Sequence, residues 1–173
     1  MQIYRVLRES LPSLALPNLH EEISEDVMKE LGRLHQLADA TELALSFVSK
    51  STLSRQKLYE KLRRKNIPQD EAKEAVRMVV GYGYLREQEQ IKMLILRYVE
   101  EGKGPALVQA KLASLGYRPK DIHEAEQSLT AQGLLDFAEA QRQRQEEMRE
   151  AGVDELGIMK KLRQLGYVTD EEC

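Results

Sequence analysis

The sequence predicts an all-α protein built from tandem three-helix repeats of about 50 residues, of helix-turn-helix type, in an extended, curved array. Two observations lead to this prediction. Strong helix formers such as Leu, Ala, Glu and Lys dominate the 173 residues, whereas Trp is absent and Phe occurs only 2 times. One phrase also recurs at a fixed interval, as KLRRKNI at 61–67, KLASLGY at 111–117 and KLRQLGY at 161–167.

Residues fifty positions apart match without gaps around each phrase. The matched sets are Lys61, Lys111 and Lys161, then Leu62, Leu112 and Leu162, and then Asn66, Gly116 and Gly166. Glycine adopts the left-handed conformation that ends many helices at little cost, and asparagine tolerates it best among the other residues. We therefore expect each phrase to end a helix in a Schellman motif. Gly83 and Gly133 predict the same ending for the next helix.

The residues before the first repeat predict one helix and leave the first stretch open. Ser24 is a favourable N-cap and indicates a leading helix near 24–34. The stretch QIYRVLRE at 2–9 is compatible with an edge strand.

Each repeat then reads as three helices in succession. The first helix carries an apolar stripe at helical spacing in two copies, formed by Leu43, Ala44, Phe47 and Val48 and by Ile91, Leu94, Ile95 and Tyr98. The third copy, FAEAQRQRQEEMREAG, is nearly all polar and predicts a solvated helix. The second helix begins at a favourable N-cap in every copy, namely Ser54, Gly104 and Asp154. The third helix opens after Pro68 or Pro119 with acidic residues, which suit the positive end of a helix dipole.

These helices divide the chain into four parts. Residues 1–35 form an N-terminal segment with the leading helix, and the repeats span 36–85, 86–135 and 136–173. The third repeat stops at TDEEC, where its last helix should begin, so we expect it to be truncated or degenerate. An array of this kind buries its core between neighbours and leaves long faces open for binding.

Charge and cysteine content narrow the range of functions. The chain carries 26 basic and 29 acidic residues, a net charge of -3, so contact with nucleic acid requires a local patch. The only cysteine, Cys173, fits a reducing compartment. No signal peptide and no membrane-spanning run is seen in the sequence. We therefore expect a cytoplasmic monomer that does not contact a membrane.

The sequence contains no recognisable catalytic or ligand-binding pattern. His20, His35 and His123 lie far apart and form no zinc motif. GYGYLR at 81–86 lacks the last glycine of a dinucleotide loop, and GKGP at 102–105 lacks the Walker spacing. We therefore expect no enzyme activity, no metal and no cofactor.

One charge feature stands out, because six cations and one acid lie between residues 55 and 65. Within this stretch Lys57, Lys61, Arg64 and Lys65 share one helix face. The face is either solvated, with cations suited to a helix C-terminus, or it faces phosphates or an acidic protein groove. Base-specific reading of DNA is disfavoured, because the third helices begin with acids. The candidate contacts are Arg55, Lys57, Lys61, Arg64, Lys65, Lys103, Lys111, Lys160, Lys161 and Arg163.

Two stretches carry a family likeness, STLSRQKLYEKLRRKNIPQDEAKEAVRMVVGYGYL and RYVEEGKGPALVQAKLASLGYRPKDIHEAEQSL. They resemble the RecX family of recombination regulators, and the likeness covers residues 24 to 167. The residues that match the family's motifs are Ser54, Leu58, Lys61, Leu62, Gly83, Tyr84, Leu85, Gly104, Pro105, Val108, Leu112 and Gly116. The residues that depart from its pattern are Lys57, Arg86, Glu89 and Gln90.

The resemblance implies a non-enzymatic regulator of the RecA recombinase. Such proteins lie along the groove of the RecA nucleoprotein filament and inhibit its activity in homologous recombination, DNA repair and the SOS response. Two other functions remain open: a low-specificity binder of single- or double-stranded DNA, and a helical scaffold for another protein. Most matched residues are helix caps and core, so they attest the fold more directly than the partner.

Overall fold

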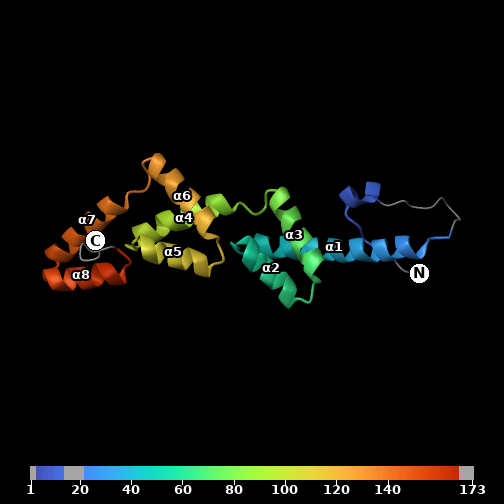
Figure 1. The fold of residues 1–173 in the computed structure, drawn as a ribbon, viewed down its shortest axis with the longest axis horizontal. Helices are drawn as coiled ribbons and strands as arrows, with labels where there is room; N and C mark the ends of the chain where they lie inside the picture. Colours follow the sequence, from blue (N-terminus) through green and yellow to red (C-terminus); the bar gives the residue numbers. More distant parts are fainter. Residues whose placement is uncertain (1–2, 14–21, 168–173) are drawn as a thin grey trace. The chain divides into compact units, whose positions relative to one another are not determined.

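The computed structural model describes residues 3–13 and 22–167, and these residues contain helices and no strand (Figure 1). The elements are the 3-10 helix η1 (Arg8–Ser13) and the α-helices α1 (Glu25–Lys50), α2 (Arg55–Arg64), α3 (Gln69–Gly81), α4 (Glu87–Glu100), α5 (Pro105–Ser114), α6 (Pro119–Ala131), α7 (Phe137–Glu150) and α8 (Glu155–Gln164). The predicted all-α fold is confirmed. The chain divides into two compact units, a first unit (Met1–Arg86) with α1 to α3 and a second unit (Glu87–Cys173) with α4 to α8.

The helix bounds repeat at an interval of fifty residues. The second helices α2, α5 and α8 begin at positions 55, 105 and 155, and the third helices α3 and α6 end at positions 81 and 131. The first helices α4 and α7 begin at positions 87 and 137. Local sequence therefore sets the length of each helix in the same way in successive copies. The curvature expected for the array stays a prediction.

Left-handed residues end the second helices, as the sequence predicts. The backbone angle φ is 60° at Asn66, 83° at Gly116 and 84° at Gly166. In the first copy the N–H of Ile67 donates to the carbonyl of Leu62 at 3.3 Å, which is the outer bond of a Schellman motif. The equivalent bonds join Tyr117 to Leu112 at 3.2 Å and Tyr167 to Leu162 at 3.0 Å.

Glycines end the third helices, and the first helices α4 and α7, in the same way, whereas α1 ends at Ser51 in an extended conformation. Gly83 and Gly133 end α3 and α6, as predicted, with φ of 76° and 69°. Gly102 and Gly152 end α4 and α7 with φ of 81° and 77°, and the sequence reading missed both. Gly102, the first glycine of GKGP, is therefore a helix stop.

The first unit is built on one long helix where the sequence predicts two. α1 runs without a break over 26 residues, so the leading helix expected near 24–34 and the first helix of the repeat 36–85 are one element. Ser24 caps it, as predicted, because its hydroxyl accepts a hydrogen bond from the N–H of Val27 at 3.4 Å. α1 packs on α2 and α3 around a core that includes Ala40, Ala44, Leu58, Leu62 and Val79.

The edge strand expected within 2–9 is wrong for the residues that the structure describes. They have no regular structure until η1 begins. The backbone N–H of Arg5 donates to Nδ1 of His35 at 3.0 Å, and its guanidinium contacts Asp39 at 2.5 Å and Glu42 at 3.0 Å. This segment therefore bonds to side chains of α1 and not to another strand.

The second unit contains two clusters of buried side chains. The larger cluster, from α4, α5 and α6, includes Ile91, Ile95, Val108, Leu112 and Leu129. The smaller cluster consists of Ile158, Leu162 and Tyr167. α7 contributes no buried residue, which agrees with the solvated helix predicted from its polar sequence.

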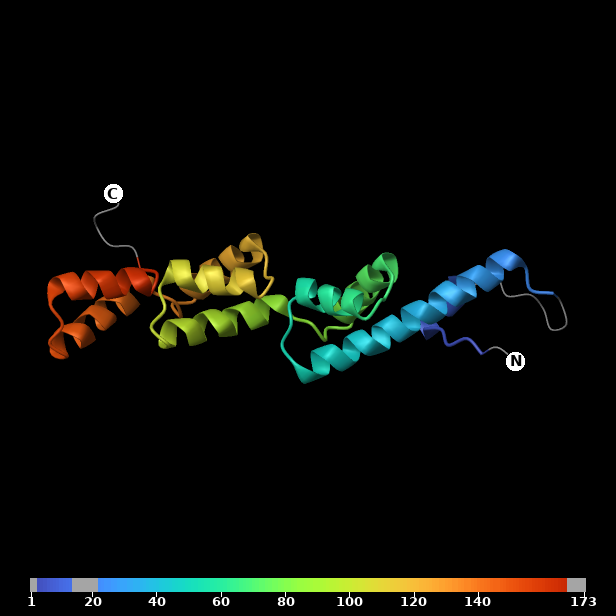
Figure 2. The same cartoon turned by 90° about the horizontal axis from the view of Figure 1, so that it is seen from below.

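α8 and α5 meet end to end within the second unit (Figure 2). The N–H of Gly104 donates to the carbonyl of Leu165 at 2.7 Å, and the N–H of Ala106 donates to the carbonyl of Gly166 at 3.1 Å. Carbonyls at the end of α8 thereby satisfy N–H groups that the start of α5 would otherwise leave free. A β-carbon on Gly104 would lie 2.6 Å from the backbone of Gly166, so this approach requires glycine.

Two equivalent tyrosines differ in how their hydroxyl groups are satisfied. The hydroxyl of Tyr117 donates to Oε1 of Gln90 at 3.1 Å. Fifty residues on, Ala140 stands in place of Gln90, and the buried hydroxyl of Tyr167 has no hydrogen-bond partner in the described part of the chain. Burial raises the pKa of Tyr117 to about 12 and also raises the pKa of Tyr167. The third copy therefore keeps the tyrosine but not its partner.

The glycine at the α8–α5 junction should matter more for stability than a glycine at an ordinary helix end. Gly104→Ala places a methyl group against the backbone of Gly166, whereas Gly133→Ala meets no atom within 4 Å and strains only a left-handed residue. We expect Gly133→Ala to lower the free energy of unfolding by about 1 kcal/mol. Gly104→Ala should lower it further and expose the amides of positions 104 and 106 to hydrogen exchange. Equal losses in urea unfolding, with both amides still protected, would contradict the junction.

The two tyrosines should respond differently to loss of the hydroxyl. Tyr117→Phe should lower the free energy of unfolding by about 1 kcal/mol, because Gln90 loses its donor. Tyr167→Phe should leave it unchanged or raise it, because no hydrogen bond is lost, and Ala140→Gln should raise it by supplying a partner. Urea denaturation of the three variants measures these changes. A loss of about 1 kcal/mol in Tyr167→Phe would mean that this hydroxyl is bonded in solution.

Candidate functional site

α2 carries the first group of candidate contacts, and Ser54 fixes where the helix starts. The Ser54 hydroxyl accepts a hydrogen bond from the N–H of Lys57 at 3.2 Å. Lys57 and Lys61 then follow at one-turn spacing. Lys57 is not an isolated charge, because its Nζ lies 3.1 Å from Oε2 of Glu60. Hydrogen bonds from Gln56 and from Lys57 lower the pKa of Glu60, so this carboxylate balances the charge at position 57.

The other cations of α2 differ in how far they are engaged. Nζ of Lys61 lies 5.3 Å from the centre of the Phe47 ring, a cation–π contact between α2 and α1. Arg55 is half-buried in the first turn. Arg64 and Lys65 are exposed, and no ion pair to either is found among the described residues. The cations that a partner can reach without breaking an internal contact therefore lie at the end of the helix.

Lys103 and Lys111 gather around one aromatic ring in the second unit. Their Nζ atoms lie 5.1 and 5.7 Å from the centre of Tyr98, and the guanidinium of Arg97 lies 5.1 Å from it. Glu101 pairs with Lys103 and, at 3.6 Å, with Arg97, and the hydrogen bond from Lys103 lowers the pKa of Glu101. One carboxylate thus faces three cations, so the cluster is a cationic surface. Arg97 is a member that the sequence reading missed.

α8 places the remaining candidates on two sides of one helix. Lys160 and Arg163 lie on the side that carries Leu156 and Met159, where a hollow of about 420 Å³ is found. Lys161 is exposed and points about 100° away around the helix. These cations therefore differ in their surroundings, since two of them border apolar side chains.

The ten predicted contacts are shared equally between the two units. The first unit holds Arg55, Lys57, Lys61, Arg64 and Lys65, and the second unit holds Lys103, Lys111, Lys160, Lys161 and Arg163. In the second unit they form separate groups and not one continuous stripe. Their contact with a partner stays a prediction.

Two kinds of site are absent from residues 3–13 and 22–167. No group of three or more His, Cys, Asp or Glu side chains there can hold a metal ion. No helix in these ranges is both long enough and apolar enough to cross a bilayer. The start of α5 at GKGP resembles an anion site, but the carbonyls of Leu165 and Gly166 already occupy two of its N–H groups.

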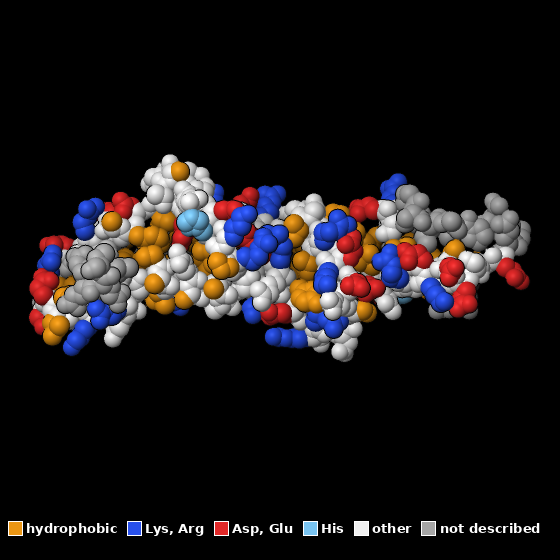
Figure 3. All heavy atoms as spheres, viewed as in Figure 1, with side chains coloured by type: hydrophobic (Ala, Val, Ile, Leu, Met, Phe, Trp, Pro, Cys, Tyr) orange, Lys and Arg blue, Asp and Glu red, His pale blue; other side chains and the backbone are white. Residues whose placement is uncertain are grey.

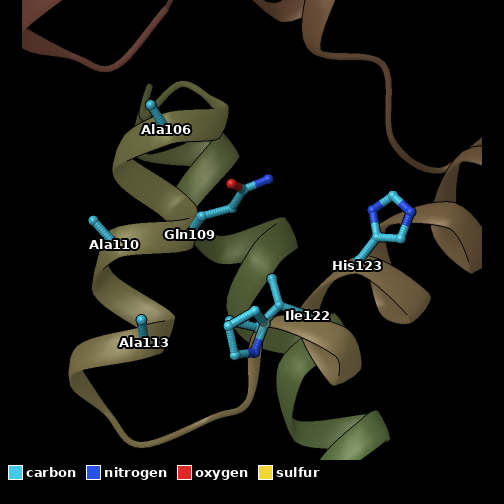
Figure 4. A pocket seen from close by; sticks show the side chains of 7 residues that line it. Ala106, Gln109, Ala110, Ala113, Ile122 and His123 are labelled. Atoms are coloured by element: carbon cyan, nitrogen blue, oxygen red, sulfur yellow. The ribbon is translucent and has the colours of Figure 1, made fainter.

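A larger hollow, of about 560 Å³, lies between α5 and α6 (Figure 4). Its lining residues are Ala106, Gln109, Ala110, Ala113, Pro119, Ile122 and His123. Apolar side chains gather on the molecular surface where these helices lie (Figure 3). The sequence reading missed this hollow, because alanine at these positions also reads as an ordinary helix former.

The fold is similar to that of known regulatory proteins. No family model matches the chain, and no curated protein matches it either. The crystal structure of regulatory protein RecX has a TM-score of 0.74 and 17% sequence identity, covering 95% of this chain and 84% of the other. The crystal structure of RecX from Lactobacillus salivarius has a TM-score of 0.63 and 15% identity, covering 79% of this chain and 90% of the other. The chain therefore has a RecX-like fold, as its sequence motifs predict.

The contacts of α2 predict which of its cations stabilise the fold. Lys61→Gln removes the contact with Phe47 and should lower the free energy of unfolding by about 0.5–1 kcal/mol. The double variant Arg64→Gln, Lys65→Gln should change it by less than about 0.5 kcal/mol, because exposed charges contribute little and glutamine keeps a similar helix propensity. Thermal unfolding of both variants at one pH compares them. A larger loss in the double variant would show that Arg64 and Lys65 are structural.

Proposed function

We propose that this protein is a non-enzymatic regulator that binds the RecA recombinase in its nucleoprotein filament and inhibits its activity in recombination and DNA repair. The observation that carries the proposal is the RecX-like fold, which extends over 95% of the chain. The motif residues that the sequence shares with that family support the same function. In this role the protein acts in the cytoplasm as a monomer and needs no cofactor.

Regulation of this kind requires a binding surface and no catalytic centre. Exposed cations with no ion pair among the described residues lie on second helices in both units, namely Arg64, Lys65, Lys160 and Lys161. They can pair with carboxylates or phosphates of a filament without breaking an internal salt bridge. A protein that binds one state of the filament more tightly slows every step that requires another state. Inhibition therefore follows from differential binding alone.

Low-specificity binding of nucleic acid is the second candidate function, and the same four cations favour it. About four phosphate contacts with duplex DNA should give a slope of log K against log salt near -3.6, since each contributes roughly -0.9. A slope close to zero, or no binding at low salt, would exclude this function. A helical scaffold for another protein is the third candidate, favoured by the hollow between α5 and α6.

The proposed function predicts inhibition of RecA that depends on α2. The purified protein should slow the single-strand-DNA-dependent ATP hydrolysis of RecA at one copy per RecA or fewer. Arg64→Glu combined with Lys65→Glu should raise the concentration needed for half inhibition at least about tenfold, because two exposed cations become repulsive. The matched control is Lys50→Glu combined with Lys73→Glu, which reverses two exposed lysines of the same unit and should inhibit like the wild type.

Three results would count against this function. In the first, the rate of ATP hydrolysis by RecA is unchanged and the protein does not sediment with filaments. In the second, the two double variants lose inhibition equally. In the third, bare single-stranded DNA removes the inhibition by titrating the regulator, which would favour the nucleic-acid binder.

A further inference from the structure

The two hollows of the second unit lie at equivalent positions of the repeat. Adding fifty to the α5 positions 106, 109, 110 and 113 gives the α8 positions 156, 159, 160 and 163, and these line the second hollow. On each helix these positions are spaced by three or four residues, so they lie on one side. The same outward side of successive second helices is therefore hollowed.

On α5 this side is uncharged. Ala106, Ala110 and Ala113 are exposed and present only methyl groups, and Ile122 of α6 borders the same hollow. Gln109 on this side donates a hydrogen bond to the carboxylate of Glu126 at 3.1 Å. Small side chains of this kind allow another helix to approach closely. This half of the surface thus favours contact with apolar side chains.

On α8 the same side is apolar and bordered by cations. Leu156 is 59% exposed, although a leucine of this kind is usually covered, and Met159 is half-buried beside it. Lys160 and Arg163 stand on the same side of the helix. Exposed apolar side chains rimmed by polar groups are typical of protein contacts.

The α8–α5 junction connects the two halves. The hollow on α8 ends near Arg163, and the carbonyl of Gly166 accepts from the N–H of Ala106, where the hollow on α5 begins. We call the surface that runs through Leu156, Met159, Ala106, Ala110 and Ala113 the α5–α8 face. It is apolar along its length and basic at its α8 end.

We propose that the α5–α8 face binds an amphipathic α-helix of a partner protein, with the apolar stripe of that helix on the face and its carboxylates beside Lys160 and Arg163. The charge distribution selects this occupant. A nucleic acid carries phosphates along its whole length, roughly one per 1.7 Å of duplex. The residues that line the hollow on α5 include no Lys or Arg to meet them, and His123 is the one titratable side chain among them. A helix with acids at one end matches a face whose cations are at one end. The inference goes beyond the proposed function, because it can be tested without RecA.

A synthetic peptide tests the α5–α8 face directly. The probe is a helical peptide of about 18 residues, or about 27 Å, with leucines on one side and glutamates beside them near one end. Fluorescence anisotropy with the full-length protein should show saturable binding that weakens as salt rises. Two control peptides, one with lysine in place of each glutamate and one of scrambled order, should bind at least about tenfold more weakly.

Variants of the protein locate the binding. Lys160→Glu combined with Arg163→Glu, and separately Ala110→Glu, should each weaken binding of the acidic peptide at least about tenfold. Thr130→Glu adds the same charge at an exposed position of α6 outside the face and should have no effect. Circular dichroism melting of each variant verifies that these exposed positions leave the fold intact.

Any of four results would overturn the proposal. The first is that the acidic peptide does not bind, and the second is that the scrambled peptide binds equally well. The third is that the α5–α8 variants bind the acidic peptide as the wild type does. The fourth is that a poly-dT oligonucleotide at equal concentration displaces the peptide from the wild-type protein. Loss of RecA inhibition does not enter this test, so the face and the proposed function can fail separately.

Discussion

A left-handed residue ends each second helix and fixes where the chain turns toward the next helix. Asn66, Gly116 and Gly166 end the second helices at the same repeat position, with φ between 60° and 84°. Because the end of each helix is fixed, its apolar residues enter the core in register in every copy. Lys61 and Lys111 occupy equivalent positions one turn before these stops, and each lies over an aromatic ring, Phe47 or Tyr98.

Glycine has a second effect where α8 meets α5. The carbonyls of Leu165 and Gly166 reach the N–H groups of Gly104 and Ala106 only because neither glycine carries a β-carbon. This contact occupies N–H groups at the start of α5 that could otherwise bind an anion. It also brings together the two hollowed helix sides of the α5–α8 face. The arrangement thus favours a protein partner over a phosphate at this place.

The sequence predicts the helices and their ends well, because caps and apolar spacing are local signals. The sequence does not predict features that depend on contacts between distant residues. The residues around Arg5 form no strand, and the backbone N–H of Arg5 bonds to His35 of α1 while its guanidinium pairs with Asp39. The basic stripe of α2 is only partly free, because Glu60 and Phe47 engage two of its lysines. The sequence analysis did not predict the hollow lined by Ala106. Comparing α5 with the equivalent positions of α8 would have shown that the outward side of α5 is uncharged, with alanine at positions 110 and 113 where α8 has Lys160 and Arg163.

Hydrogen exchange of this protein bound to RecA filaments on single-stranded DNA reports which helices the filament covers, and so tests whether the second helices form the binding surface. We predict slower exchange in α2, which carries the exposed Arg64 near its end, and in at least one of the second helices α5 and α8, while the polar helix α7 exchanges as in the free protein. Bare single-stranded DNA should not reproduce this pattern. Protection confined to α7, or the same protection with DNA alone, would contradict a filament regulator that acts through its second helices.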